Sequence, residues 1–236
     1  MNTTKNLITT IYPAAQRIVE ETDKFRRYST FDVNDKFLVR RQFGSLLQVN
    51  DVTLAPLEAL TVTASSDLCI VLVPTVGVIE CWNVVKELIF TGNACRYMMS
   101  EGEELKIKNP LSDRLVTYIQ FNFNVSSIDF SDHLFSIEPL DNNKNKLVEL
   151  FSTPDISSEQ SNSIARIGMY DGRQKDSFAA TSDKNYLFVL VLQGAFEVED
   201  RLLEASDALG IYDCRAIEFE ALSNDAIILL IQMQKL

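Results

Sequence analysis

Few residues in this chain could carry chemistry, and imidazole is nearly absent among them. The 236 residues contain a single histidine, His133. Iron, copper, nickel and zinc sites that lack clustered cysteines depend mainly on neutral imidazole ligands. The four cysteines, Cys69, Cys81, Cys95 and Cys214, show no CxxC spacing. We therefore predict no metal site and four buried free thiols, which fits a cytoplasmic protein.

Two other groups of reactive residue types are weaker. Residues 131–133 (SDH) have the side-chain types of a catalytic triad, but adjacency in sequence does not give triad geometry. Residues 101–104 (EGEE) are typical of a solvated hairpin tip rather than an acid and base pair. No GxGxxG or P-loop spacing occurs. These groups predict no catalytic residue.

The elements that would position such residues are short strands, and their order occurs twice. Residues 67–82 and 186–198 each predict a strand, a glycine turn and a second strand, with Gly77 and Gly194 in the turns. Three further strand-like segments follow each hairpin. The LKI at 105–107 precedes the IEF at 217–219 by 112 residues, while the glycines are 117 apart, so the first half has a hairpin about five residues longer near 82–93. A duplication of this kind predicts two related β units.

The predicted fold class is all-β, with two tandem barrels and a few short helices. Residues 1–30 are expected to form an N-terminal arm with a short helix over 14–25, and 31–135 the N-terminal domain. Residues 136–163 are expected to form a linker that includes a helix over 143–151, and 164–236 the C-terminal domain. The arm is expected to cover a strand edge of this chain or of a second subunit, which leaves oligomerisation open.

Charge and hydropathy limit the partners. The formal net charge is −11 and the pI about 4.6, which argues against direct nucleic-acid binding. The sequence contains no run of 18 apolar residues, so no membrane-spanning segment is predicted. The first residues contain no apolar segment of the signal-peptide type. A protein partner or a small molecule is the expectation.

Three segments carry a family resemblance. Residues 190–233, 43–56 (FGSLLQVNDVTLAP) and 113–123 (DRLVTYIQFNF) resemble pirin-like bicupins in their turn glycine, Phe-Gly-x-Leu segment and final strands. The resemblance covers most of residues 25–236. It implies two cupin-type, jelly-roll barrels. Many members of this family hold one iron in the first barrel and have flavonol (quercetin) dioxygenase activity or a role as a transcriptional cofactor. The resemblance implies these properties as expectations for this chain.

The resemblance also assigns metal-ligand positions, and this chain departs from the pattern there. The His-x-His pair of the family falls on Thr63 and Ser65, and the second ligand pair falls on Leu105 and Ile107. Hydroxyls are weak neutral ligands, and Leu and Ile side chains offer no electron pair. A divergent member without its metal and without any other cofactor is therefore expected.

Strand alternation adds two residues to the candidate site. It puts Thr63, Ser65, Asp67 and Cys69 on one face, which the resemblance turns towards the barrel interior. Cys69 lacks a neighbouring base and is interpreted as a core thiol. Asp67 is interpreted as a strand-end residue bonded to backbone amides. The full candidate pocket consists of Thr63, Ser65, Asp67, Cys69, Leu105 and Ile107.

Two functions remain open at this point. The favoured one is a metal-free, non-catalytic module that binds a small apolar or aromatic molecule, with Trp82 and Tyr97 as candidates for its mouth, or that binds a protein, with regulation as one option. The alternative is a dioxygenase or another enzyme that uses the N-terminal cavity. An apolar, filled interior favours the first function, and an open polar cavity favours the second.

Overall fold

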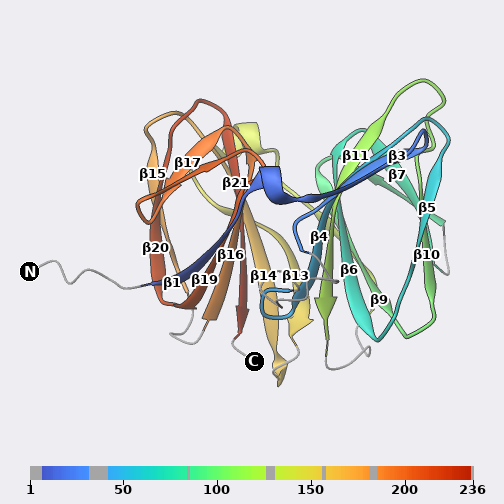
Figure 1. Ribbon diagram of the computed structural model, residues 1–236, viewed down its shortest axis with the longest axis horizontal. Helices are drawn as coiled ribbons and strands as arrows, with labels where there is room; N and C mark the ends of the chain where they lie inside the picture. Colours follow the sequence, from blue (N-terminus) through green and yellow to red (C-terminus); the bar gives the residue numbers. More distant parts are fainter. Residues whose placement is uncertain are drawn as a thin grey trace, which may run out of the picture. The chain divides into compact units, whose positions relative to one another are not determined.

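The computed structural model describes residues 7–31, 42–83, 86–125, 131–155, 158–180 and 185–234. These residues form two compact units, and the colours of Figure 1 let the reader follow the chain through them. The N-terminal unit contains Arg17–Ile137 and Thr153–Ser161, and the C-terminal unit contains the chain up to Gln16, Glu138–Ser152 and Asn162–Leu236. The units differ from the expected domains, because the start of the chain belongs to the C-terminal unit.

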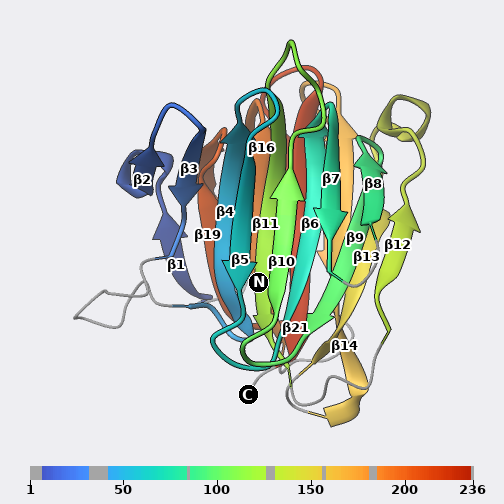
Figure 2. The ribbon, with the colours of Figure 1, turned by 90° about the vertical axis from the view of Figure 1, so that its right-hand side faces the viewer.

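The N-terminal unit is built from two antiparallel sheets. Buried and exposed residues alternate along two strands of the smaller sheet, so this sheet turns one apolar face towards the larger one. Figure 2 shows the small sheet in front of the large one. The small sheet has the order β5 (Ala59–Thr63), β10 (Glu104–Lys108), β7 (Val78–Trp82), β8 (Lys86–Phe90), and the large sheet the order β12 (His133–Ser136), β9 (Asn93–Met99), β6 (Leu68–Val76), β11 (Val116–Asn124), β4 (Leu46–Leu54), β3 (Phe25–Ser29), β2 (Ile18–Glu21).

The C-terminal unit repeats this arrangement. Its core is a cluster of buried aliphatic and aromatic residues, in which Tyr170 packs edge-on against Phe196 and Phe219. The small sheet has the order β15 (Lys175–Ala179), β20 (Ala216–Ala221), β17 (Ala195–Val198), β18 (Arg201–Glu204), and the large sheet the order β1 (Ile8–Tyr12), β19 (Ala208–Cys214), β16 (Asn185–Gln193), β21 (Ala226–Gln234), β14 (Ser158–Tyr170), β13 (Val148–Asp155).

The strand orders confirm the duplication and the all-β fold class. β6 and β7 correspond to β16 and β17, and both connecting glycines have positive φ, +81° at Gly77 and +75° at Gly194. A Cβ at Gly194 would lie 2.2 Å from Ser223 Oγ, so this turn requires glycine. At the edge next to β19, β1 takes the place that β12 takes next to β9. The expected arm thus covers a strand edge within its own chain.

Two helix predictions were wrong. Residues 14–25 form a short 3-10 helix, η1 (Ala14–Gln16), and then enter β2 and β3, because Thr22 Oγ1 accepts hydrogen bonds from the amides of Lys24 and Phe25 and closes a turn. The linker has one 3-10 turn, η2 (Leu140–Asn143), and β13 replaces the expected helix over 143–151, since Asn145 has φ +64°. Within the described ranges, no helix is both long and apolar enough to cross a membrane.

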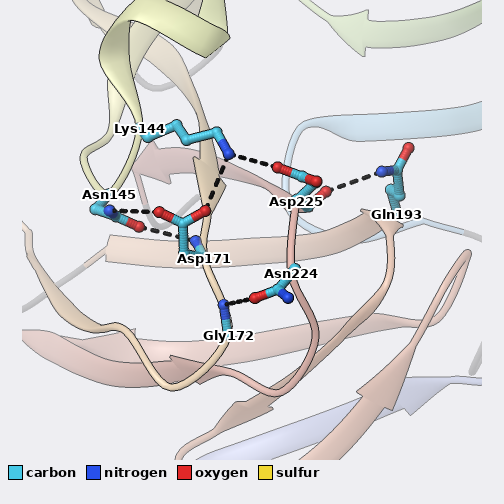
Figure 3. Close-up of polar contacts among 7 residues, drawn as sticks. All are labelled: Lys144, Asn145, Asp171, Gly172, Gln193, Asn224 and Asp225. Carbon is cyan, nitrogen blue, oxygen red and sulfur yellow. Dashed lines mark hydrogen bonds and ion pairs between the residues drawn. The ribbon is translucent and has the colours of Figure 1, made fainter.

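A polar cluster fastens the connecting segment to the C-terminal unit (Figure 3). Lys144 Nζ lies 2.5 Å from Asp225 Oδ1 and 3.0 Å from Asp171 Oδ1. The side chain of Asn145 donates to Asp171 Oδ2 and accepts from the Asp171 amide. These contacts raise the pKa of Lys144 and lower that of Asp171. The cluster thus joins two residues of the connecting segment to Asp171 and Asp225, which lie next to or in turns of the same unit.

Candidate functional site

The six residues of the candidate pocket do not come together. Thr63, Ser65 and Asp67 are exposed, whereas Leu105 and Ile107 are fully buried in the core of the N-terminal unit. Cys69 is also fully buried but is absent from this core cluster. The predicted pocket therefore divides into surface positions, a core pair and a separate thiol.

The error lies in which face of the strands packs against the core. Leu105 pairs with Val62, which packs against the core, and Thr63 pairs with the exposed Glu104. The chain then bends after Ala64, which is itself buried in the core, and β6 starts with the inward-facing Leu68. Val62, Ala64, Leu68 and Ile70 thus face the core on both sides of the bend, so alternation was right that the predicted residues share one face. The orientation of that face was wrong, because it points away from the core.

The interpretations of Asp67 and Cys69 agree with the structure. Asp67 Oδ1 accepts a hydrogen bond of 3.0 Å from the amide of Glu101, so it closes a turn at the end of the small sheet. Cys69 is 0% exposed, and burial raises the pKa of its thiol far above the ordinary value. All four cysteines are buried and free, as predicted. A thiol with these properties is a weak nucleophile at neutral pH.

Hydrocarbon occupies the inward face of the small-sheet strands β5 and β10. The inward positions there are Leu60, Val62, Leu105 and Ile107, and Ala64 continues the same face beyond β5. None of these side chains has an atom that can bind a metal ion. Across the described parts of the chain, no group of three or more His, Cys, Asp or Glu side chains is arranged to hold a metal. The residues present do not fit the metal that the resemblance implies.

The facing large sheet carries amides on its inward face. Gln120 and Asn122 on β11 pair with the core residues Leu72 and Ile70, so they share the inward face and are 4% and 5% exposed. Gln120 Nε2 donates to Asn122 Oδ1, and Asn122 Nδ2 donates to Gln48 Oε1, each at 2.8 Å. Because these amides hydrogen-bond to one another, the cost of burying them is offset, and the bonded groups are not free to bind a ligand.

Sequence reasoning missed a second polar group beside the core. Glu87 Oε2 accepts hydrogen bonds from Cys95 Sγ at 3.4 Å and from Tyr97 Oη at 3.3 Å. Burial raises the pKa of Cys95 to about 12 and that of Tyr97 further still. Tyr118 Oη is also buried, and no partner for it is present among the described residues. The thiol and the phenols stay protonated at neutral pH, so this group lacks an activated nucleophile.

Trp82 and Tyr97 do not line a common mouth. Tyr97 is 2% exposed and belongs to the core, whereas Trp82 lies in register with Lys106 on the outward face of the small sheet. Residues 131–133 likewise form no triad: Asp132 Oδ1 accepts from the amide of Met98, and His133 stacks edge-on against Phe135 at 4.4 Å. The single imidazole is exposed, away from the core of its unit.

The C-terminal unit has an open groove of about 550 Å³ on its small sheet. Six carboxylates line it, on Asp176, Glu197, Glu199, Asp200, Glu218 and Glu220. Lys175 is the one cation among the lining residues, and its Nζ lies 3.1 Å from Glu220 Oε2. Five of the carboxylates follow from the outward positions of β17 and β20 and from the turn between β17 and β18, and Asp176 on β15 accepts a hydrogen bond of 2.6 Å from Tyr170 Oη. The groove is therefore strongly acidic.

Comparisons with known proteins agree with the duplicated fold. Residues 159–233 match the family described as the quercetinase C-terminal cupin domain. A search of curated proteins found no significant match. YhhW from Escherichia coli superposes with a TM-score of 0.81 at 14% identity, covering 97% of this chain and 99% of that one. Two tandem cupin units in one chain define a bicupin.

Two further structures specify the type of bicupin. The nickel(II) complex of the bacterial pirin YhhW from Escherichia coli gives a TM-score of 0.78 at 14% identity, covering 97% of this chain and all of that one. Quercetin 2,3-dioxygenase from Acinetobacter baumannii gives 0.69 at 15% identity, covering 95% of this chain and 85% of that one. The fold of this chain is that of a pirin-like bicupin.

Proposed function

We propose that this chain is a metal-free, non-catalytic bicupin that acts by binding protein. The observation that carries the proposal is the inward face of β5 and β10, where Leu60, Val62, Leu105 and Ile107 pack into a contiguous core. A catalytic cavity needs space and polar groups directed into it. Here hydrocarbon lines the inward face of β5 and β10, and the amides of the facing sheet bond to one another.

The choice of a protein over a small ligand rests on where the open surface lies. The small sheet of the N-terminal unit turns hydrocarbon inwards and also exposes large apolar side chains on its outer face, with Leu88 at 46% and Phe90 at 53%. The groove of the C-terminal unit has little apolar surface and is lined mainly by carboxylates. Such a surface suits a cationic protein better than an apolar molecule.

The rival function is the flavonol dioxygenation named for one structural relative. We expect no oxygen uptake above the protein-free rate when this chain is mixed with quercetin and supplied in turn with iron, copper, nickel, manganese and zinc. The reason is that its inward positions offer no metal ligand. An oxygen electrode makes the measurement, and a metal-loaded quercetin dioxygenase serves as the positive control. Uptake proportional to the concentration of this protein would restore the enzyme function.

A further inference from the structure

The outward faces of the two small sheets are equivalent by duplication but opposite in charge. The offset of 112 residues places Lys106 of β10 at the position of Glu218 of β20, and Lys108 at that of Glu220. Both pairs lie on the solvent side of their sheets, between inward-facing core residues. The same position in the fold is therefore cationic in one unit and anionic in the other.

The face of the N-terminal unit combines lysines with exposed apolar surface. In one row across β10, β7 and β8, Trp82 lies between Lys106 and Lys86, whose ammonium groups are 5.2 and 5.1 Å from its ring centroid. The next row holds Lys108, Glu80 and Leu88. Phe90 extends the apolar surface along β8. We name this surface, made of Trp82, Lys86, Leu88, Phe90, Lys106 and Lys108, the lysine face.

The lysine face has charge to offer a partner. Glu80 is 6% exposed and already paired with Lys86, whose Nζ lies 2.5 Å from Glu80 Oε2. Within the described residues, no carboxylate lies at ion-pair distance from Lys106 or Lys108. Two unpaired ammonium groups beside a half-buried indole and exposed Leu88 form a surface that matches an acidic partner with some apolar contact.

The acidic groove of the C-terminal unit meets that description. Of its six carboxylates, only that of Glu220 is paired with a cation among the described residues, by Lys175 and Arg173. Leu202, which pairs with Glu197 across β17 and β18, is 62% exposed and supplies apolar surface beside the groove. The groove therefore offers negative charge that complements the lysine face, together with some apolar contact.

We propose that the lysine face of one copy docks on the acidic groove of a second copy. This inference rests on the proposed protein-binding function and names its partner. Because the two surfaces differ, the contact is heterologous, and a dimer formed by it keeps one free face of each kind. Association therefore continues beyond the dimer as concentration rises. Opposite charges across the contact also make it sensitive to salt.

Sedimentation and tryptophan emission test the inference together. We expect the average mass to rise above that of the 26.7-kDa monomer between about 10 and 500 µM protein at low salt, as for weak interfaces. The chain has one tryptophan, and it lies on the lysine face, so its emission should shift to the blue over the same range. At 0.5 M salt both changes should disappear.

Charge reversal provides the decisive variants. Lys106→Glu with Lys108→Glu makes both faces acidic, and Glu197→Lys with Glu218→Lys removes most of the net negative charge of the groove, so each variant alone should stay monomeric. An equimolar mixture should associate again, because the unaltered groove of the first variant meets the unaltered lysine face of the second. Asp141→Lys with Glu149→Lys changes net charge as the second variant does, at exposed positions elsewhere, and should associate like the unaltered protein.

The outcomes separate this inference from the function on which it rests. A protein that remains monomeric to 500 µM at low salt, or variants whose mixture stays monomeric although each is folded, would overturn self-association. Either result would leave the metal-free, non-catalytic proposal standing, since that proposal is tested by oxygen uptake and metal content. Association that persists unchanged in both reversal variants would also overturn the proposed contact between the lysine face and the acidic groove.

Discussion

Replacing Leu105 or Ile107 by alanine is expected to lower the free energy of unfolding of the N-terminal unit by about 2 to 5 kcal/mol. Both side chains are 0% exposed and pack in the core between the two sheets. Truncation removes buried hydrocarbon and leaves a cavity that the surrounding strands fill only in part. Urea unfolding followed by the fluorescence of Trp82 measures the effect, because this residue pairs with Lys106 in the adjacent position of β10.

A matched control sits on the neighbouring strand. Thr63→Ala changes an exposed side chain on β5, and we expect it to alter stability by no more than about 0.5 kcal/mol. The comparison separates a packed core from an open cavity. If Leu105→Ala and Ile107→Ala cost as little as Thr63→Ala, the interior would have the space of a ligand site, and the non-catalytic proposal would lose its support.

The sequence was sufficient to predict two related β units because strand order and turn glycines repeat within it, and the family resemblance supplied the cupin type. Gly77 and Gly194 mark hairpins whose backbone needs positive φ, and this requirement is visible in the letters alone. The internal positions of Leu105 and Ile107 could also be predicted, since β10 alternates without interruption. The orientation of Thr63 could not be predicted, because alternation separates the two faces of a strand without showing which of them packs against the facing sheet.

The lysine face and the acidic groove were beyond sequence reasoning for another reason. Lys86, Trp82 and Lys106 lie on three strands, and only their register brings them into one row. The carboxylates of Glu197 and Glu218 are likewise joined by pairing between β17 and β20. The helix prediction for the connecting segment failed for a different reason. Asn145 adopts a left-handed backbone conformation that ends any helix there, and a single asparagine in the sequence is a weak signal for that conformation.

Deletion of residues 1–16 is expected to destabilise the C-terminal unit by about 3 kcal/mol or more, with increased aggregation. β1 pairs with β19 over five residues, and Tyr12 at its end is 2% exposed against Phe188. The amide of Ala14 also donates to Asp207 Oδ1 at 2.7 Å. Loss of a buried aromatic alone costs about 3 to 5 kcal/mol, and removal of β1 leaves the edge of β19 unpaired.

Hydrogen exchange resolved by peptide reads the two units separately. Peptides from β19 and β16 should exchange faster in the deletion variant, while those from β6 and β11 in the N-terminal unit should not change. A variant that lacks only residues 1–6 keeps β1 and should behave like the intact chain. Unchanged protection of β19 in the longer deletion would contradict the structural role of β1.

Metal content is the measurement that tests the central claim most directly. The protein should be purified without a histidine tag, incubated separately with iron, copper, nickel, manganese and zinc, freed of excess metal, and measured by plasma mass spectrometry. Because hydrocarbon occupies the inward face of β5 and β10, we predict less than about a tenth of an equivalent of each metal. One equivalent of any of them, bound by the intact chain, would contradict the account and favour an enzyme.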